Sequence, residues 1–309
     1  MKANPYTYYY KSRNFYKFYK YNNPGKNIYF SYADPNDPIH RKALIRSIEF
    51  VSGQPYLYNI YREYQKNPER WDSFWDGCVD LLKLDVQYDK EKIKNVPSKG
   101  PLMIVANHPF GVLDGLVICW LTNKIRSEFK VLTHSLLLRA SETKDYLLPI
   151  DFSESKNAMI TNLETRKTAR SILDNGGTIV VFPGGTVSTT KRFYNRTALD
   201  PSWRNFTSRL IKRSKPTILP LHFTGQNSFL FQTASHLSET LRSSLLFHEV
   251  KRRINTKVPV IIGDPIKYSD IDENLSNSEL SEYLRNKTYK INPFWKSKDV
   301  PLGKDFKEF

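Results

Sequence analysis

A histidine and an aspartate six positions apart are the first residues whose types and spacing could do chemistry. His108 lies two residues after the apolar run 102–106, and Asp114 follows where the next helix is expected to begin. A connection of this length can fold back so that the carboxylate accepts a hydrogen bond from one imidazole nitrogen. That contact would fix the tautomer and make the other nitrogen a general base for an alcohol or an amine. The alternative is a structural histidine, with Asp114 serving as a helix N-cap.

No residue of the chain itself is a good candidate for a nucleophile. The sequence contains no Gly-x-Ser-x-Gly elbow, and neither cysteine lies in a suitable motif. A substrate group is therefore expected to attack directly, without a covalent enzyme intermediate. The remaining histidines show no metal-ligand spacing, so we expect no metal.

A pair of glycines forms the second candidate site. Gly184 and Gly185, followed by Thr186, come directly after the apolar run 178–183. Backbone N–H groups in such a loop can bind a phosphate or a developing oxyanion, although most glycine pairs only mark tight turns. We take these three residues, with Asn107 beside the histidine, as candidates for binding an oxyanion or an acceptor.

A basic stretch follows the glycines. Residues 191–215 contain eight Lys and Arg and one acid, Asp200. A solvated face is one interpretation, and a surface for a phosphate-bearing headgroup or an acidic carrier protein is the other. Arg192, Arg196 and Arg204 are nearest to the glycines in the sequence, so they are the candidates for that binding.

Alternating strands and helices must position these groups. Strands are expected at 102–106, 129–133, 178–183, 217–221 and 258–263. Helices are expected at 114–121, 156–173, 203–212 and 237–250, and a capping box at Ser276 and Glu279 begins a last one. This order indicates an α/β fold with a mixed, largely parallel sheet flanked by helices. Loops at the carboxyl ends of such strands carry the chemistry.

The N-terminal third differs from the rest of the chain in composition and in predicted secondary structure. Residues 1–33 hold six Lys and Arg and no acid among many aromatic residues, which predicts a basic aromatic tail that is either poorly ordered or placed at anionic lipid. Residues 34–90 are expected to be a helical extension that packs on a domain at 91–309, and 90–100 a charged loop. The net charge of +16 favours a polyanionic partner. We expect no signal peptide and no transmembrane helix, and we place the protein peripherally at the cytoplasmic face of the membrane.

Three motifs, in this order and spacing, resemble those of the glycerolipid and lysophospholipid acyltransferases. The first is Asn107-His108 with Asp114, the second is Phe182-Pro183-Gly184-Gly185-Thr186, and the third is the strand 260–262 followed by Gly-Asp-Pro-Ile. The resemblance covers about 90–270. Segments such as 148–151, 225–228 and 241–242 look like the hemolysin-related bacterial branch, which includes enzymes that acylate lyso-ornithine lipid.

The resemblance implies a fold, a reaction and roles for residues. It implies an acyltransferase catalytic domain at 91–309 in which His108 is the general base and Asp114 orients it. The acyl donor would be a thioester on coenzyme A or acyl carrier protein, the acceptor a lysolipid, and no cofactor would be required. The family often carries a glutamate where this chain has Gly184, which disfavours glycerol-phosphate acceptors and favours a lyso-aminolipid.

Two alternatives stay open at this point. The same site could serve a lipid or thioester hydrolase, with water replacing the lysolipid. The charge and the aromatic tail would also fit a non-catalytic basic protein that binds membrane or nucleic acid. That second alternative leaves three ordered motifs unexplained, so we expect no nucleic-acid partner.

Overall fold

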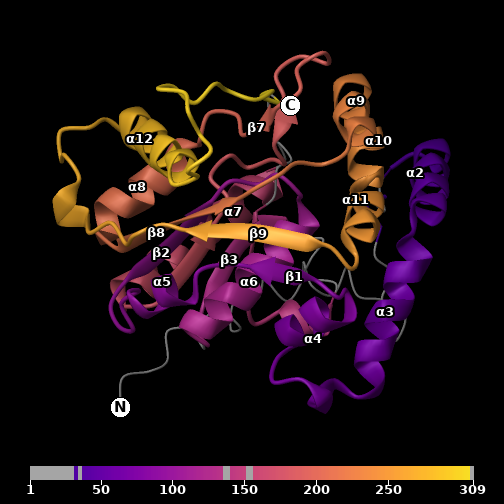
Figure 1. Ribbon diagram of the computed structural model, residues 1–309, viewed down its shortest axis with the longest axis horizontal. Coiled ribbons are helices and arrows are strands. Elements are labelled where there is room, and N and C mark those ends of the chain that lie inside the picture. Colours follow the sequence, from indigo (N-terminus) through magenta and orange to yellow (C-terminus); the bar gives the residue numbers. More distant parts are fainter. Residues whose placement is uncertain (1–30, 34–36, 135–139, 151–155, 307–309) are drawn as a thin grey trace.

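The computed structural model describes residues 31–33, 37–134, 140–150 and 156–306, and its centre is one seven-stranded sheet (Figure 1). The strand order is β1-β9-β8-β2-β5-β3-β4, and every neighbouring pair is parallel except β8 with β9. The strands are β1 (Asp85–Gln87), β2 (Leu102–Ala106), β3 (Lys130–His134), β4 (Leu147–Ile150), β5 (Thr178–Val181), β8 (Thr217–Phe223) and β9 (Lys257–Ile262). The mixed, largely parallel α/β fold is thus confirmed.

Helices cover both faces of this sheet, and further helices precede it. They are α2 (Ile39–Ser52), α3 (Gln54–Lys66), α4 (Phe74–Leu81), α5 (Lys90–Lys94), α6 (Val112–Ile125), α7 (Lys156–Asp174), α8 (Asn205–Ser214), α9 (Phe229–Leu237), α10 (Glu239–Ser244), α11 (Leu246–Arg253) and α12 (Asn277–Lys290). The two-residue strands β6 (Thr189–Thr190) and β7 (Ala198–Leu199) form a separate antiparallel pair. No helix in the described ranges is both long and apolar enough to cross a membrane.

The central strand β2 is buried on both faces, which explains its unbroken apolar sequence. Leu102 and Ile104 pack in one core cluster with side chains of α4 and α6, whereas Met103 and Val105 pack in another with α7, α8 and α12. Successive side chains of a strand point to opposite faces, so a strand between two layers must be apolar at every position. The result is a three-layer arrangement with β2 at its centre.

The topology places the two candidate loops at the same edge of the sheet. Strands β2 and β5 are adjacent and parallel, with Val105 opposite Val181. Their following loops, which carry His108 and Gly185, therefore leave the sheet side by side. This is the carboxyl edge at which parallel sheets commonly bind ligands.

Four local predictions are wrong. Region 34–90 is not entirely helical, because Asp85–Gln87 forms the edge strand β1 against β9, too short to show an alternation. The charged loop at 90–100 contains the helix α5, capped by the Asp89 carboxylate accepting from the Glu91 N–H at 2.9 Å. Strand β4 was not predicted, because its run of four residues is short and contains Pro149, which cannot donate a backbone hydrogen bond.

The fourth wrong prediction is the single helix at 237–250. Helix α9 ends at Leu237 and two further short helices follow, because the Ser238 side chain caps a new helix at Glu239 and Leu245 separates that helix from the next one. Of the predicted tail at 1–33, only residues 31–33 are described, and 1–30 lie outside the described residues. Within 31–33, Ser31 donates to the buried Glu49 carboxylate at 2.6 Å.

The C-terminal segment 299–306 runs back across the β6–β7 pair (Figure 1). The Gly303 N–H donates to the Asp200 carbonyl at 2.9 Å, and the Lys304 N–H donates to the Thr189 carbonyl at 3.2 Å. A Cβ atom on Gly303 would lie 1.8 Å from the Leu199 carbonyl oxygen, so only glycine fits this crossing. The segment therefore packs closely against the strand pair that follows the glycine loop.

Buried His222 on β8 gives the fold a pH dependence. Burial lowers the pKa of His222 to about 4 from its ordinary 6.5. The unfolded chain thus binds more protons between these values, and the free energy of unfolding should fall as the pH falls through that window, by at most about 3 kcal/mol. Urea unfolding across this window should show a flatter profile for His222→Gln, whereas exposed His40→Gln should retain the wild-type slope. Equal slopes for wild type and His222→Gln would contradict this origin.

Candidate active site

The imidazole ring of His108 is held in place by Asp114 and Phe182, and the side chain also lines a cavity. Its Nδ1 lies 3.0 Å from Asp114 Oδ2, and its ring stacks on Phe182 with centroids 4.1 Å apart. The side chain lines the cavity and is 18% exposed. The Nε2 atom has no hydrogen-bond partner among the described residues. A neutral imidazole in this setting presents one basic nitrogen to whatever occupies the cavity.

Asp114 serves the histidine and the helix at once. It lies in the first turn of α6, is fully buried, and its Oδ2 also accepts from the N–H groups of Phe110 at 2.7 Å and Gly111 at 3.0 Å. Burial raises the pKa of Asp114, and the hydrogen bonds from His108 and the two amides oppose that shift. Asp114 is therefore the partner of the histidine, and it is the third residue of α6, whose N-cap is Gly111; the interpretation of Asp114 as the N-cap residue itself is wrong.

The tight turn between them depends on Gly111. Its φ of +76° is in the region that disfavours side chains. A Cβ atom there would also lie 3.0 Å from Leu246 and 3.1 Å from Val187. This glycine lets the chain reverse within three residues, which brings the carboxylate back to the ring.

The glycine loop lies beside His108, but its members are placed differently. Gly185, with φ of +70°, lines the cavity, and its N–H closes a turn onto the Phe182 carbonyl at 3.0 Å. Gly184 is buried against Asp200, and Thr186 Oγ1 accepts from Arg242 at 2.8 Å. The structure thus brings one of the three predicted residues to the cavity wall, and the oxyanion role of all three stays a prediction.

Asn107 has a structural task that sequence reasoning missed. Its Nδ2 donates to the Phe223 carbonyl at 2.9 Å, and its Oδ1 accepts from the Phe223 N–H at 2.7 Å. The residue is 3% exposed. Because both ends of the amide are engaged with the end of β8, we correct the expectation that Asn107 binds an oxyanion and assign it to holding the two strand ends together.

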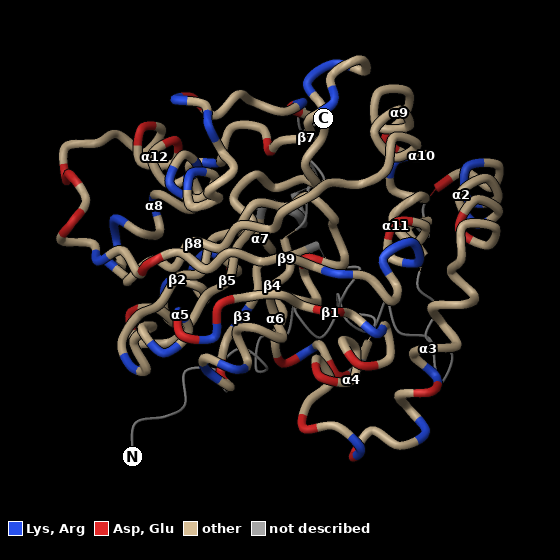
Figure 2. Tube along the Cα trace, viewed as in Figure 1, with Lys and Arg blue, Asp and Glu red and all other residues tan. Residues whose placement is uncertain are grey.

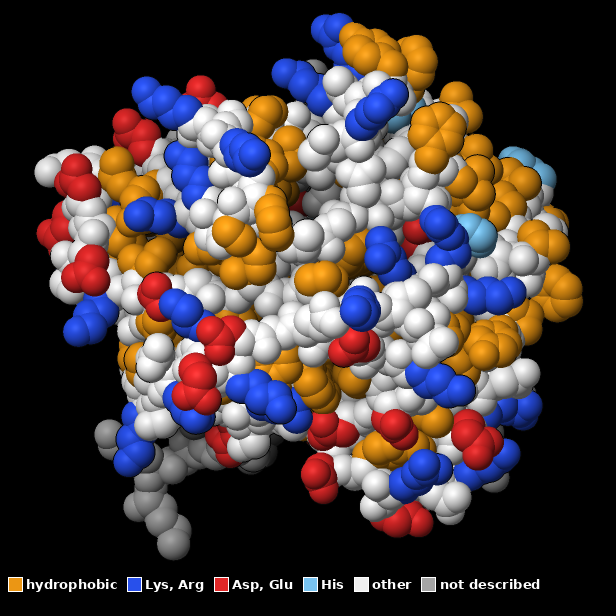
Figure 3. Space-filling view, in the orientation of Figure 1, with side chains coloured by type: hydrophobic (Ala, Val, Ile, Leu, Met, Phe, Trp, Pro, Cys, Tyr) orange, Lys and Arg blue, Asp and Glu red, His pale blue; other side chains and the backbone are white. Residues whose placement is uncertain are grey.

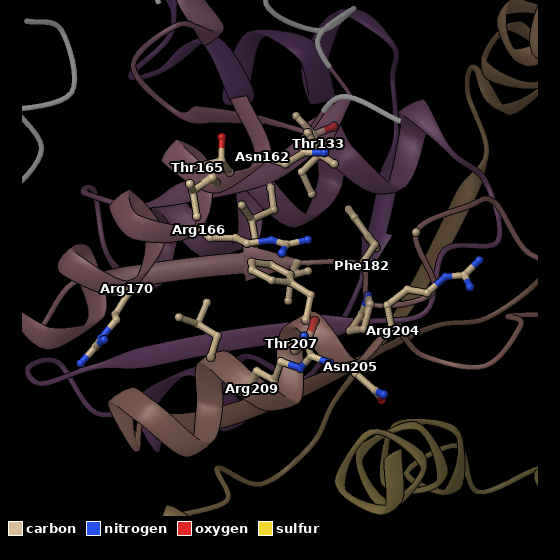
Figure 4. Close-up of a pocket in the computed structure, with 18 of the residues that line it drawn as sticks. Thr133, Asn162, Thr165, Arg166, Arg170, Phe182, Arg204, Asn205, Thr207 and Arg209 are labelled. Carbon is tan, nitrogen blue, oxygen red and sulfur yellow. The ribbon is translucent and has the colours of Figure 1, made fainter. Parts of the chain in front are cut away.

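A cavity of about 900 Å³ extends from His108 between α7 and α8 (Figure 4). None of the described residues that line it is acidic. Six basic side chains line it, namely Arg166, Lys167, Arg170, Arg204, Arg209 and Arg213. Figure 4 shows Arg166 crossing the middle, with Arg170 and Arg204 at opposite ends. Such a wall is suited to an anionic ligand.

Most of these cations are not neutralised by the protein. Among them, only Arg170 and Arg204 make ion pairs with described acids, Asp174 and Asp305. Figure 2 shows several acidic residues around α4 and basic residues around α8. The positive potential of the cavity is thus available to a ligand.

Of the three arginines predicted to bind a headgroup or a carrier, one lines the cavity and two do not. Arg204 lines the cavity as expected of a binding residue, whereas Arg192 and Arg196 are exposed in the connection between β6 and β7 and do not line it. The residues that sequence reasoning missed had a signal. Arg166 and Arg170 are spaced four apart on the predicted helix 156–173, which places both on one face. Arg209 and Arg213 have the same spacing, although Arg213 lies one residue beyond the predicted helix 203–212.

The chain belongs to the acyltransferase family, because a family model described as "Acyltransferase" matches residues 48–297. The resemblance found in the sequence motifs is thereby confirmed.

Two curated relatives are each described as a lyso-glycine lipid O-acyltransferase. The one from Phocaeicola vulgatus is 22% identical over 241 residues, which cover 75% of this chain and 82% of that protein. The one from Bacteroides thetaiotaomicron is 23% identical over 225 residues, covering 71% and 79%. A solved structure, the 1-acyl-sn-glycerophosphate acyltransferase PlsC from Thermotoga maritima, covers 96% of this chain and 95% of its own at 16% identity and a TM-score of 0.45.

Proposed function

We propose that this acyltransferase transfers a fatty acyl group from a thioester to the hydroxyl of a lysolipid, with His108 as general base. The observation that carries the proposal is the His108 ring, anchored through Nδ1 and open to the cavity through Nε2. The acceptor oxygen attacks the thioester carbonyl carbon while Nε2 takes the hydroxyl proton. The tetrahedral intermediate then collapses, the C–S bond breaks, and the departing thiolate recovers the proton from His108.

Asp114 supports both halves of this cycle. Its carboxylate accepts from Nδ1–H, which leaves the lone pair on Nε2, and its negative charge stabilises the imidazolium that forms during attack. No side chain of the enzyme becomes acylated in this scheme. An ester and a free thiol are the only products.

The acceptor we propose is a lyso-aminolipid whose headgroup is glycine. The names of the two relatives support this class. Glycine linked through its nitrogen keeps a free carboxylate, which arginine binds well. An ornithine headgroup adds a free ammonium, and no acid lines the described cavity to receive it. These observations favour a glycine lipid over the ornithine lipid suggested by the sequence resemblance.

The donor we propose is an acyl thioester of phosphopantetheine, on coenzyme A or acyl carrier protein. Both carriers bear phosphate next to the pantetheine arm, and the basic wall suits that group as well as the acceptor headgroup. The cavity is large enough for more than one substrate group. Comparing the two carriers as donors decides between them.

We also propose that the enzyme docks on the surface of an anionic membrane, where its lysolipid resides. Figure 3 shows apolar side chains gathered along the edge formed by α2 and α9. Ile39, Phe50, Val51, Phe229 and Leu237 there are 67% to 82% exposed. Exposed apolar side chains on a strongly basic protein fit an anionic lipid surface.

The test of the function is a reconstitution with purified protein. Acyl-CoA or acyl-ACP is mixed with lyso-glycine lipid, lyso-ornithine lipid or lysophosphatidate, in detergent or in anionic vesicles, and the diacyl lipid and released thiol are quantified. We expect lyso-glycine lipid to be the best acceptor and vesicles to accelerate the reaction. Thiol release with free fatty acid and no dependence on lysolipid would instead establish a hydrolase.

The basic wall yields a separate prediction. Arg166→Ala and Arg209→Ala should each raise the KM for an anionic substrate about 10-fold, because each removes one charged hydrogen-bond donor. Arg192→Ala is the matched control, since that arginine lies outside the cavity, and its KM should stay near the wild-type value. An increase in KM at Arg192 as large as that at Arg209 would contradict the assignment of anion binding to the cavity wall alone.

A further inference from the structure

A second buried carboxylate, Asp200, contacts His108. Asp114 binds the side chain of this histidine, whereas Asp200 binds its backbone N–H. Asp200 is fully buried directly after β7. Its Oδ1 accepts from the His108 N–H at 3.2 Å and from Ser188 Oγ at 2.5 Å, and its Oδ2 accepts from Trp203 Nε1 at 2.8 Å. One side chain thus joins the loop after β2, the loop after β5 and the entry to α8.

The His108 backbone is held from both sides by this cluster. Its N–H donates to Asp200, and its carbonyl accepts from the Ser188 N–H at 2.8 Å. Gly184 faces Asp200 as well, since a Cβ atom added to this glycine would lie 3.4 Å from the Asp200 carboxylate. The position of the imidazole relative to the glycine loop is therefore set through Asp200.

Asp200 is itself fixed by the C-terminal part of the chain. Its N–H donates to the Tyr289 hydroxyl at 2.8 Å. Its carbonyl accepts from the fully buried Arg285 guanidinium at 3.1 Å and from the Gly303 N–H at 2.9 Å. A residue whose polar atoms are all hydrogen-bonded has little freedom to move, so it can fix the positions of the groups that it binds.

The three partners of the carboxylate explain why the residue is an acid. All three are donors, and an ionised carboxylate offers acceptors only. An asparagine would direct its NH₂ group either at the Trp203 indole N–H or at the His108 and Ser188 donors. A buried charge without hydrogen bonds is costly, but here each oxygen is satisfied.

We propose that Asp200 is a positioning residue that keeps the His108 base in register with the glycine loop during acyl transfer. The inference rests on the proposed general-base role of His108. Because Asp200 would act by holding the position of His108, its replacement should change kcat far more than KM. A displacement of the base by about 1 Å can cost about 100-fold in rate.

The test combines Asp200→Asn with a rescue. In Asp200→Asn the amide oxygen keeps the two donors at Oδ1, and the NH₂ group then opposes Trp203. We expect kcat to fall about 10- to 100-fold with both KM values within about 3-fold of wild type. Adding Trp203→Phe removes the opposing donor, so the double variant should be more active than Asp200→Asn alone. Absence of a kcat loss, or absence of rescue, would overturn the proposal.

A second variant keeps the test decisive if Asp200→Asn does not fold. Ser188→Ala removes the side-chain hydrogen bond from the loop after β5 to Asp200, keeps the backbone hydrogen bond of residue 188 to the His108 carbonyl, and should lower kcat several-fold at unchanged KM. Ser281→Ala is its control, because it deletes a buried hydroxyl contact to Ser208, 3.1 Å long, away from His108. Equal kcat values for these two variants would overturn the assignment. Full activity of His108→Ala would instead reject the proposed function, so the two failures are distinguishable.

Discussion

Replacing His108 with alanine is expected to lower kcat by about 10²- to 10⁴-fold, the usual contribution of a general base. KM should change little, because the basic side chains that line the cavity, and that we propose to bind the anionic groups of the substrates, are untouched. The fold should survive, since the ring is partly exposed and packs mainly on Phe182. Initial rates of diacyl lipid formation and a thermal unfolding curve measure both effects.

Two additions make that experiment specific. Exogenous imidazole should restore part of the activity of His108→Ala, because the variant opens space at the cavity wall beside Phe182 and Gly185. His40→Ala is the control, as this histidine is exposed on α2. A His108→Ala variant that acylates lysolipid at the wild-type rate would remove the base from the mechanism altogether.

Two substitutions of Asp114 are expected to differ sharply in activity. Asp114→Ala leaves the N–H groups of Phe110 and Gly111 without an acceptor and frees the imidazole, so the loss should approach that of His108→Ala. Asp114→Asn should retain much more activity. Its amide oxygen must occupy the Oδ2 position, because an NH₂ group there would face both backbone N–H groups.

The tautomer of His108 is the reason for the difference. In Asp114→Asn the amide oxygen still accepts from Nδ1–H, so only the charge is lost. A hydrogen bond to a charged group contributes roughly 1–1.5 kcal/mol more than one between neutral groups, which corresponds to a loss of about 5- to 12-fold in kcat. Steady-state rates and the ¹⁵N shifts of the His108 ring should report these outcomes. A reversed tautomer of His108 in Asp114→Asn would show that the backbone N–H groups of Phe110 and Gly111 do not fix the orientation of the new side-chain amide.

The part of the site that is local in the chain could be predicted from the sequence. His108 and Asp114 are six residues apart, and one glycine turn closes the distance between them. The main strands were predictable because buried strands are uninterrupted apolar runs. Their loops meet because parallel neighbours end at one edge, which is a rule of topology rather than of this particular chain.

The remainder depends on contacts between distant residues, which a single sequence does not encode visibly. Asn107 meets the backbone of Phe223, and a backbone partner leaves no residue-type signal. Asp200 was interpreted as the lone acid of a basic stretch, and its burial depends on α12 and the segment 299–306. The short edge strand β1 exists only because β9 provides a partner.

The return of segment 299–306 to Asp200 has a consequence for biosynthesis. His108 and the glycine loop leave the ribosome long before Gly303, yet the residue between them is anchored by Gly303 and Arg285. The nascent chain can form β2, β5 and their loops first, because domains fold as their segments emerge. The contacts that Arg285 and Gly303 make to the Asp200 carbonyl can form only after these later residues have been synthesised. Synthesis of the loops around His108 thus precedes synthesis of the residues that anchor Asp200 between them.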